Sequence, residues 1–283
     1  MGKQKRSENT YQKINTIFYR DEKNVIMQHD AFTEPEFEYL RGLKWRGECK
    51  IDGTNIRLEV HREIIYNKEY ENNVELVETD EVLGVKFNVS YKGKTDSAQV
   101  PPKLLKYLEE TYPKEKILES LGLAEEIDVK DFADHKWETA EDVPYLYTIY
   151  GEGYGAGIQK AGGNYIKDGV GFAVFDVKVN STWLKVEARD EIAGKLGAPV
   201  VPFIGYFTLD EAIEYVKKGF KTGLWDNKDM FEEGLVLRTE IGLLNRMGKR
   251  IITKIKYEDF EKYRRVYGTD DPVEQVRNPH YSE

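Results

Sequence analysis

The chain is poor in cysteine and histidine. Cys49 is the only cysteine among 283 residues, so no disulfide can form within the chain, and a reducing, cytoplasmic setting is the default expectation. The four histidines are scattered and share no ligand spacing with Cys49, which argues against a structural zinc site. They are His29, His61, His135 and His280.

Long apolar runs are missing too. No stretch approaches the roughly 20 apolar residues that cross a bilayer. The basic start of the chain, residues 1–6, lacks the apolar core of a secretion signal. We therefore expect no membrane partner. Hydrophobic residues make up 40% and charged residues 33% of the chain, which is typical of a soluble globular protein with one large or two modest domains.

Positive charge is in deficit, because the formal net charge is -9. This deficit argues against nonspecific coating of nucleic acid. The charge is uneven, however: residues 109–142 are rich in acids, and residues 246–265 are rich in lysine and arginine. The basic stretch can offer a local cationic groove to a polyphosphate. A solvated strand and helix face is the alternative interpretation of the same residues.

Hydrophobic periodicity and turn residues predict strands with interspersed helices, without regular strand–helix alternation. This pattern favours the α+β class with largely antiparallel sheets. Helices are expected at 34–42, after Pro101-Pro102, and at 184–196, 209–218 and 257–267. Strands are expected at 45–60 with a turn at Asp52-Gly53, and at 64–66, 74–77, 85–91, 145–150, 171–179, 200–204, 234–238 and 250–256.

No linker rich in proline, glycine or serine divides the chain, so we expect a single domain over residues 1–283. Its expected parts are a flexible tail at 1–12, an N-terminal extension at 13–45, a catalytic core at 46–260 and a short C-terminal segment at 261–283.

The most informative stretch is Glu48-Cys49-Lys50-Ile51-Asp52-Gly53-Thr54-Asn55. A lysine in a buried, polar pocket can lose its proton and become a nucleophile. Four residues recur by chance, but further motifs follow in order, and five ordered motifs are far less expected by accident than one. These further motifs are Tyr150-Gly151-Glu152, Phe172-Ala173-Val174-Phe175-Asp176, Glu233-Gly234-Leu235-Val236-Leu237-Arg238 and Lys254-Ile255-Lys256.

In this order the motifs resemble the covalent nucleotidyltransferase superfamily of nucleic-acid ligases and capping enzymes. Within it the chain looks most similar to phage-type, ATP-dependent RNA ligases of the RNA ligase 2-like group, over residues 13–260. Supporting stretches are Lys13-Ile14-Asn15-Thr16, Arg20-Asp21, Lys94-Thr95-Asp96 and Gly153-Tyr154-Gly155. The resemblance implies an ATP-grasp-like ligase adenylation fold, with mostly antiparallel sheets flanked by helices. It also implies a phage-like protein that acts in the cytoplasm of its host.

The resemblance implies ligation of RNA ends in three steps. Lys50 attacks the α-phosphorus of ATP, which gives a lysyl-AMP and pyrophosphate. AMP then passes to a 5′-phosphate, and a 3′-hydroxyl displaces it. A free amine has a pKa of about 10.4, so less than about 0.1% of it is neutral at pH 7. Burial and neighbouring cations favour the neutral amine, and Lys254, Lys256 and a bound Mg²⁺ or Mn²⁺ would supply that charge.

Carried over residue by residue, Lys50 matches the nucleophile and Glu233 the acid that organises the metal. Lys254 and Lys256 alternate onto one strand face, so both can reach one phosphate chain. Together these four are the expected catalytic residues. The expected nucleotide-binding residues are the same four with Glu48 and Cys49 beside the nucleophile, Asn55, Lys94, Glu152 and Phe175.

Individual roles follow for the residues that lie outside the catalytic four. Glu152 matches the acid that holds the ribose hydroxyls, and Asn55 matches an asparagine near the phosphate-transfer end. Phe175 matches the aromatic ring that stacks on adenine, although the same residue suits a strand core. Lys94 stands where relatives often carry arginine, which keeps the charge and loses the bidentate fork.

Three alternatives stay open. Asp52 stands where close relatives often have histidine and DNA ligases have aspartate, so DNA or RNA–DNA hybrid ends are a second substrate class. The second alternative is a non-catalytic module that binds RNA ends or AMP, and the third is a subunit of a repair complex. The residues alone are also compatible with GTP in place of ATP. Only 27 residues follow Lys256, 283 minus 256, so we expect no C-terminal oligonucleotide-binding barrel, and either a self-sufficient monomer or an accessory protein.

Overall fold

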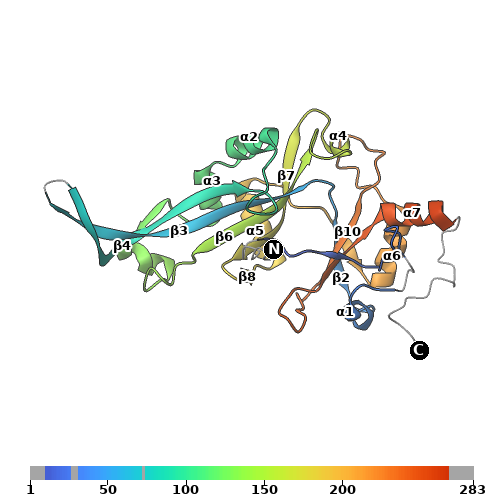
Figure 1. The fold of residues 1–283 in the computed structure, drawn as a ribbon, viewed down its shortest axis with the longest axis horizontal. Coiled ribbons are helices and arrows are strands. Elements are labelled where there is room, and N and C mark those ends of the chain that lie inside the picture. The colour runs from blue at the N-terminus through green and yellow to red at the C-terminus, as the bar shows by residue number, and fades with distance from the viewer. Residues whose placement is uncertain (1–9, 27–30, 72–73, 268–283) are drawn as a thin grey trace. The chain divides into compact units, whose positions relative to one another are not determined.

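The computed structural model describes residues 10–26, 31–71 and 74–267, and Figure 1 shows its ribbon. The chain forms two compact units, which are described separately. The first unit contains residues 10–11 and 53–200, and the second contains residues 12–52 and 201–267. Most of the predicted tail at 1–12, and the C-terminal segment from residue 268, lie outside the described residues. The prediction of one functional domain stays a prediction.

The first unit is built on a six-stranded sheet with the strand order β5-β4-β3-β6-β7-β8. Every neighbouring pair in this sheet is antiparallel. The strands are rich in β-branched and aromatic residues, which pack well on a pleated surface. They are β3 (Thr54–Glu71), β4 (Val74–Lys92), β5 (Glu126–Asp128), β6 (Leu146–Gly155), β7 (Val170–Val179) and β8 (Thr182–Trp183).

Strands β3 and β4 continue far beyond their neighbours. β3 pairs with β6 only from Thr54 to His61, whereas its pairing with β4 continues to Glu71. The outer part is therefore a two-stranded ribbon, which Figure 1 shows projecting from the sheet. None of residues 62–68 and 80–83 is buried. Because the pairing of β3 with β4 continues through these residues, the shorter strands expected at 64–66, 74–77 and 85–91 are parts of two long ones.

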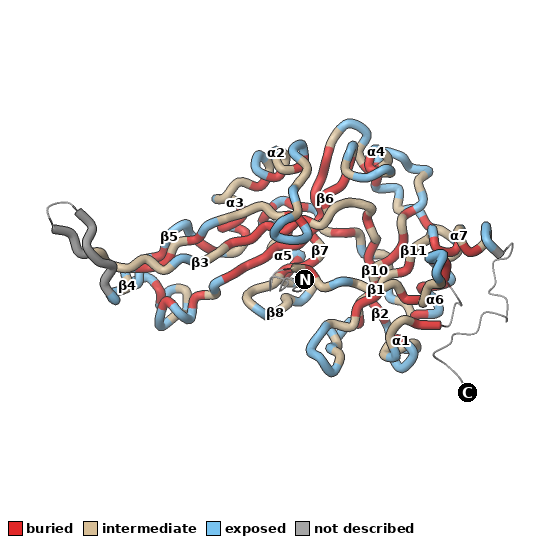
Figure 2. Tube along the Cα trace, in the orientation of Figure 1, coloured by how far each residue is buried: buried red, intermediate tan, exposed pale blue. Residues whose placement is uncertain are grey.

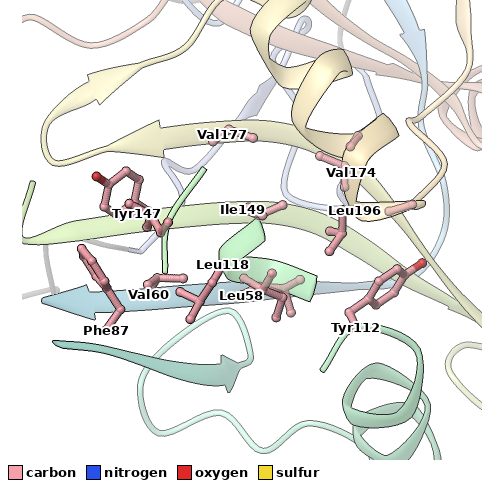
Figure 3. Packing of buried hydrophobic residues seen from close by; sticks show 14 of the residues in the cluster. Leu58, Val60, Phe87, Tyr112, Leu118, Tyr147, Ile149, Val174, Val177 and Leu196 are labelled. Atoms are coloured by element: carbon pink, nitrogen blue, oxygen red, sulfur yellow. The ribbon is translucent and has the colours of Figure 1, made fainter. Parts of the chain in front are cut away.

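An apolar core lies between this sheet and its helices (Figure 2). Leu58 and Ile149 of the sheet are fully buried against residues such as Leu118 and Leu196 from helices, and Figure 3 shows these side chains together. The helices of this unit are α2 (Pro102–Thr111), α3 (Lys114–Ser120), the 3₁₀ helix η1 (Val129–His135), α4 (Gly162–Tyr165) and α5 (Val186–Leu196).

The second unit is built on a five-stranded sheet with the order β1-β11-β10-β2-β9. All pairs are antiparallel except β1 with β11. One face carries the apolar side chains of Trp45, Leu235 and Leu237, which pack in a second core with the helices. The elements are β1 (Asn15–Thr16), α1 (Pro35–Tyr39), β2 (Trp45–Cys49), β9 (Phe203–Phe207), α6 (Leu209–Lys218), β10 (Gly234–Thr239), β11 (Ile252–Lys256) and α7 (Tyr257–Tyr267).

Helix α6 shows how local sequence sets these elements. Thr208 caps its first turn by accepting from the Glu211 backbone N–H, and the Glu211 carboxylate accepts from the Thr208 N–H. This reciprocal pair satisfies donors that a helix start leaves open. Leu209, Ile213 and Val216 recur at helical spacing and are buried, so the capped helix docks one apolar stripe on the second core.

The α+β class with antiparallel sheets flanked by helices is confirmed. In the residues that the structure describes, neither strand order closes on itself, so no barrel is formed there. A search of those same residues finds no helix with the length and apolarity needed to cross a bilayer.

Candidate functional site

Three charged side chains of the second unit meet where β2 ends. Lys50 directly follows β2, and Glu233 directly precedes β10. Lys50 Nζ donates to Glu233 Oε2 at 2.5 Å, and Lys256 Nζ lies 2.9 Å from Glu233 Oε1. Each carboxylate oxygen therefore holds one ammonium group. The predicted nucleophile, one predicted strand lysine and the predicted metal-organising acid lie together.

The backbone around Glu233 explains why glycine follows it. The Lys50 N–H donates to the Gly234 carbonyl at 2.9 Å, and the Tyr257 N–H donates to the Glu233 carbonyl at 2.9 Å. Gly234 has a φ of +151°, and a Cβ there would lie 1.9 Å from the Ile255 carbonyl oxygen. Only glycine fits this close approach of β11. The Glu-Gly pair thus places its carboxylate beside both lysines.

Strands β2, β10 and β11 form a charged face on the side of the sheet opposite the apolar core. Alternation along β2 puts Arg46, Glu48 and Lys50 on this face. Across the sheet, Glu48 is opposite Val236, which is opposite Lys254. Lys256 follows Lys254 by two residues and shares its face, as the sequence predicts. The predicted catalytic residues therefore come from one side of one sheet.

Two ionisable side chains near this face have raised pKa values, for different reasons. Burial lowers the pKa of Lys256, but Glu233 and Glu258 raise it by more, so the net pKa lies above its usual range. Lys256 therefore stays charged. The pKa of Asp52 is raised, by burial first and then by Glu233, against the opposing effect of Lys50.

Glu232 is a buried carboxylate that the sequence analysis missed. It is 1% exposed. Its Oε1 accepts from Thr222 Oγ1 at 2.5 Å, from the Thr222 N–H at 3.2 Å and from Trp225 Nε1 at 2.7 Å. Its Oε2 accepts from Cys49 Sγ at 3.1 Å. Four donors thus compensate one buried carboxylate, and they tie the residue before Lys50 to the residue before Glu233.

The side chains of Cys49 and Glu48 are engaged within the protein. Burial raises the pKa of the Cys49 thiol well above its usual range, and the charge and hydrogen bond of Glu232 add to that shift. Glu48 is 1% exposed, and its carboxylate lies 3.1 Å from Arg46 Nε and 3.0 Å from an Arg238 guanidinium nitrogen. The nucleotide contacts predicted for Glu48 and Cys49 stay predictions.

In the first unit, Asn55, Glu152 and Phe175 share the sheet face opposite the apolar core. Asn55 is directly opposite Glu152, which is opposite Ala173, and Phe175 follows two residues later on β7. The Asn55 Oδ1 is buried and has no hydrogen-bond partner among the residues that the structure describes. A buried acceptor without a donor is costly, so this atom is suited to a ligand donor.

A second glycine connects two of the motifs within this unit. A Cβ on Gly53 would lie 2.3 Å from the Gly153 carbonyl oxygen and 2.8 Å from Glu152 Cγ. The glycine of the Lys-x-Asp-Gly motif is thus required where β3 approaches the strand that carries Glu152. Gln159 Nε2 also donates to the Gly53 carbonyl at 3.2 Å, which holds the glycine-rich segment after β6 against the same point.

The Phe175 ring is half-buried in an aromatic group. Tyr11 approaches it edge-on at a centroid distance of 5.0 Å, and Tyr150 lies 6.5 Å away in a stacked arrangement. The Tyr11 hydroxyl donates to Asp176 Oδ2 at 2.6 Å. Tyr11 is another residue that sequence reasoning missed. Both the adenine-stacking role and the packing role of Phe175 stay predictions.

Lys94 is exposed in the segment that follows β4, and a buried arginine holds this segment. Arg57 is fully buried. It donates to the Gly93 carbonyl at 2.8 Å, to Asp96 Oδ1 at 2.8 Å and to Glu59 Oε1 at 2.8 Å. Lys94, which is exposed, thus lies between two residues that Arg57 contacts.

The donor set suits a divalent ion that is held mainly by phosphate and water. No group of three histidine, cysteine, aspartate or glutamate side chains able to hold a metal occurs in the described ranges. Glu233 provides a carboxylate whose side chain is 14% exposed. Mg²⁺ commonly binds through one or two carboxylates together with substrate phosphates, so Glu233 fits that mode.

Comparisons with known proteins agree with the fold. A family model described as RNA ligase matches residues 43–256. No curated protein matches the chain. A Naegleria gruberi RNA ligase solved with pyrophosphate is 17% identical, with a TM-score of 0.50, over 93% of this chain and 59% of that chain.

Two mutants of the Naegleria gruberi enzyme are similar to the same extent. One, solved with AMP and Mn, is 15% identical over 91% of this chain and 58% of that chain, with a TM-score of 0.50. Another, solved with ATP and Mn, is 16% identical over 93% and 59%, with a TM-score of 0.50. The chain thus spans about three-fifths of the length of these relatives. At this identity the likeness concerns the fold.

Proposed function

We propose that this chain, which belongs to the RNA ligase family, joins the 5′-phosphate and 3′-hydroxyl ends of RNA with ATP, through a covalent lysyl-AMP on Lys50. The observation that carries the proposal is the contact of Lys50 and Lys256 with the two oxygens of Glu233. A nucleophile for phosphoryl transfer needs positive charge around the reacting phosphate, and this arrangement supplies it.

In the first step, the Lys50 amine attacks the α-phosphorus of ATP, and pyrophosphate leaves. The attacking amine must be neutral, so Lys50, whose side chain is 19% exposed, passes the proton through which it now bonds to Glu233 to solvent water before it attacks. Lys256 keeps its proton, because its pKa is raised. It therefore offers a fixed charge to the phosphate oxygens, together with Lys254 on the same strand face.

Glu233 is the residue we assign to Mg²⁺ or Mn²⁺. The ion, bound to this carboxylate and to phosphate oxygens, would neutralise phosphate charge. The Naegleria gruberi RNA ligase mutants solved with AMP and Mn and with ATP and Mn support the use of a nucleotide and a divalent ion.

The nucleoside contacts are assigned to the first unit. Glu152 accepts from the ribose hydroxyls, and the half-buried Phe175 ring stacks on adenine. Asn55, on the strand next to Glu152, is assigned to the phosphate-transfer end, because its Oδ1 has no hydrogen-bond partner among the described residues and can accept from a ligand. Lys94 is assigned to a phosphate contact, since the residue is exposed and Arg57 holds its segment. The whole chain is proposed to act as one adenylyltransferase domain, as a cytoplasmic monomer.

The first test is labelling with ATP that carries a labelled α-phosphate. Label is expected to stay on the wild-type protein after denaturation and to be absent from Lys50→Ala. A matched control is Lys106→Ala, since the Lys106 side chain is 75% exposed on α2; this variant should label fully. Glu233→Ala and Lys254→Ala should fold and fail to label. Label on Lys50→Ala contradicts the proposed nucleophile.

A second test follows the label onto nucleic acid. Labelled protein is expected to pass AMP to a 5′-phosphorylated RNA and to seal a nick with an RNA 3′-hydroxyl. Faster sealing of DNA or RNA–DNA nicks would favour the alternative substrate class. Tight AMP binding without pyrophosphate release would instead indicate a non-catalytic subunit, and activity only after addition of another protein would show that an accessory partner is needed.

A further inference from the structure

Strand β9 forms one edge of the five-stranded sheet and exposes two neighbouring aromatic rings. Phe203 is 46% and Tyr206 is 45% exposed. Their ring centroids lie 5.2 Å apart at an interplanar angle of 63°. A register shift opposite Gly47 and Glu48 inserts one extra residue in β9, so that Phe203 and Tyr206, three residues apart, lie on one face. Ile204 and Phe207 pack against the second core instead. The exposed pair therefore has no role in that core, and adjacent exposed rings are typical of a binding surface.

An arginine lies over one ring of this pair. The Arg46 guanidinium carbon lies 4.1 Å from the Phe203 ring centroid, which is a favourable cation–π distance. Arg46 Nε also lies 3.1 Å from Glu48 Oε1. Glu48 also lies 3.0 Å from an Arg238 guanidinium nitrogen, so the carboxylate that holds Arg46 beside the rings is itself held in place. The remaining Arg46 donors are preorganised for an anion.

The pair lies on the same sheet face as Lys50. Phe203 is opposite Glu48, and Tyr206 is opposite Arg46. Lys50 follows two and four residues after those partners, or roughly 7–13 Å along the strand at about 3.3 Å per residue. At about 3.4 Å per nucleotide along one strand of a duplex, this distance corresponds to about two to four nucleotides.

We propose that Phe203 and Tyr206 form a stacking platform for a base of the RNA strand, a few nucleotides from the end being joined, and that Arg46 contacts the adjacent phosphate. The inference rests on the proposed function and adds a place for its substrate. Unpaired RNA bases stack on aromatic rings and on arginine planes. The Arg46 guanidinium, and the row of lysines on the same face, match a polyanion.

The test separates RNA binding from adenylylation. Binding of a 5′-phosphorylated single-stranded RNA is measured by fluorescence anisotropy, at a fixed salt concentration. The Phe203→Ala/Tyr206→Ala variant should bind at least about 5-fold more weakly, since stacking contributes about 1–3 kcal/mol per base. Its labelling by ATP alone should equal that of wild type. The matched control is Tyr39→Ala, because Tyr39 is 88% exposed on α1 of the same unit.

Two further variants distinguish stacking from charge. Tyr206→Trp keeps an aromatic surface and should retain wild-type affinity for RNA. Arg46→Gln should lower the slope of log affinity against log salt by about one, as expected for loss of one phosphate contact. The aromatic variants should leave that slope unchanged, because they remove no charge.

Unchanged RNA affinity in Phe203→Ala/Tyr206→Ala overturns the platform, and so does loss of ATP labelling in that variant. Loss of binding to another protein, with RNA affinity intact, would assign the rings to that partner and would also overturn it. The proposed function fails separately, if wild-type protein takes no label from ATP. RNA binding is measured without ATP and is read independently of that result.

Discussion

Replacing Glu232 tests the structure most directly, because its two oxygens have different partners. Oε1 accepts from three N–H or O–H donors of Thr222 and Trp225. Among the residues that the structure describes, Oε2 accepts only from the Cys49 thiol, which is a weak donor. Glu232→Ala removes both oxygens, whereas Glu232→Gln keeps one carbonyl oxygen for the three strong donors. The two variants should therefore differ in stability.

The magnitude follows from these contacts. Hydrogen bonds to a charged group contribute about 1.5–3 kcal/mol each, so three of them set an upper limit near 5–9 kcal/mol for Glu232→Ala. Removing the buried charge relieves a desolvation penalty of several kcal/mol. The expected net loss is about 3 kcal/mol. In Glu232→Gln the bonds weaken but remain, and the amide NH₂ meets the Cys49 sulfur, so about 1 kcal/mol is expected.

Urea unfolding followed by circular dichroism measures both losses. Each kcal/mol should also lower the melting temperature by roughly 2–4 °C. Glu214→Ala serves as the matched control, because the Glu214 side chain is 56% exposed on α6, and its effect should lie within about 0.5 kcal/mol. Equal losses for Gln and Ala, or a loss below about 1 kcal/mol for Ala, would refute the assignment of donors to oxygens.

Three more predictions concern other parts of the chain. Burial raises the pKa of Cys49 above that of a free thiol, which is about 8.5. The thiol therefore contributes its full stabilisation below about pH 8.5, and this contribution falls as the pH rises toward the folded pKa. The free energy of unfolding between about pH 7.5 and 10 should decline more steeply in wild type than in Cys49→Ala. Thr208→Ala removes the α6 cap and should cost about 1 kcal/mol by the same urea assay, and an unchanged midpoint would contradict the capping role. Arg57→Met leaves the buried Glu59 without its nearest guanidinium and should cost about 3–5 kcal/mol in thermal unfolding, with a loss under about 1 kcal/mol counting against a buried ion pair.

Elements with strong local signals were predictable from the sequence. The expected helices at 209–218 and 257–267 have the bounds of α6 and α7, because capping residues and apolar spacing act within a few residues. The turn at Asp52-Gly53 likewise separates β2 from β3. Strand β9 begins at Phe203 instead of residue 200, and α3 was not expected, because the pairing and packing that select them come from distant parts of the chain.

The candidate site shows the same division. Lys50, Glu233 and Lys256 were identified from ordered motifs, and they lie in contact. Glu232, by contrast, contacts a cysteine 183 residues away, and Tyr11 bonds to an aspartate 165 residues away. No local pattern distinguishes such residues, since their burial is created by tertiary folding. The role of Gly53 was also visible only as a turn, whereas its packing against Glu152 needed coordinates.

The outer β3–β4 ribbon has consequences for local unfolding and for sequence variation in this protein. An isolated two-stranded hairpin is marginal in water, and residues 62–68 and 80–83 bury no side chain completely. Their amide hydrogens should therefore exchange through local opening, long before those of the sheet that holds Leu58 and Ile149. Insertions and deletions in this stretch can accumulate during evolution at small cost, because they alter the ribbon and leave the packed core of the first unit in place.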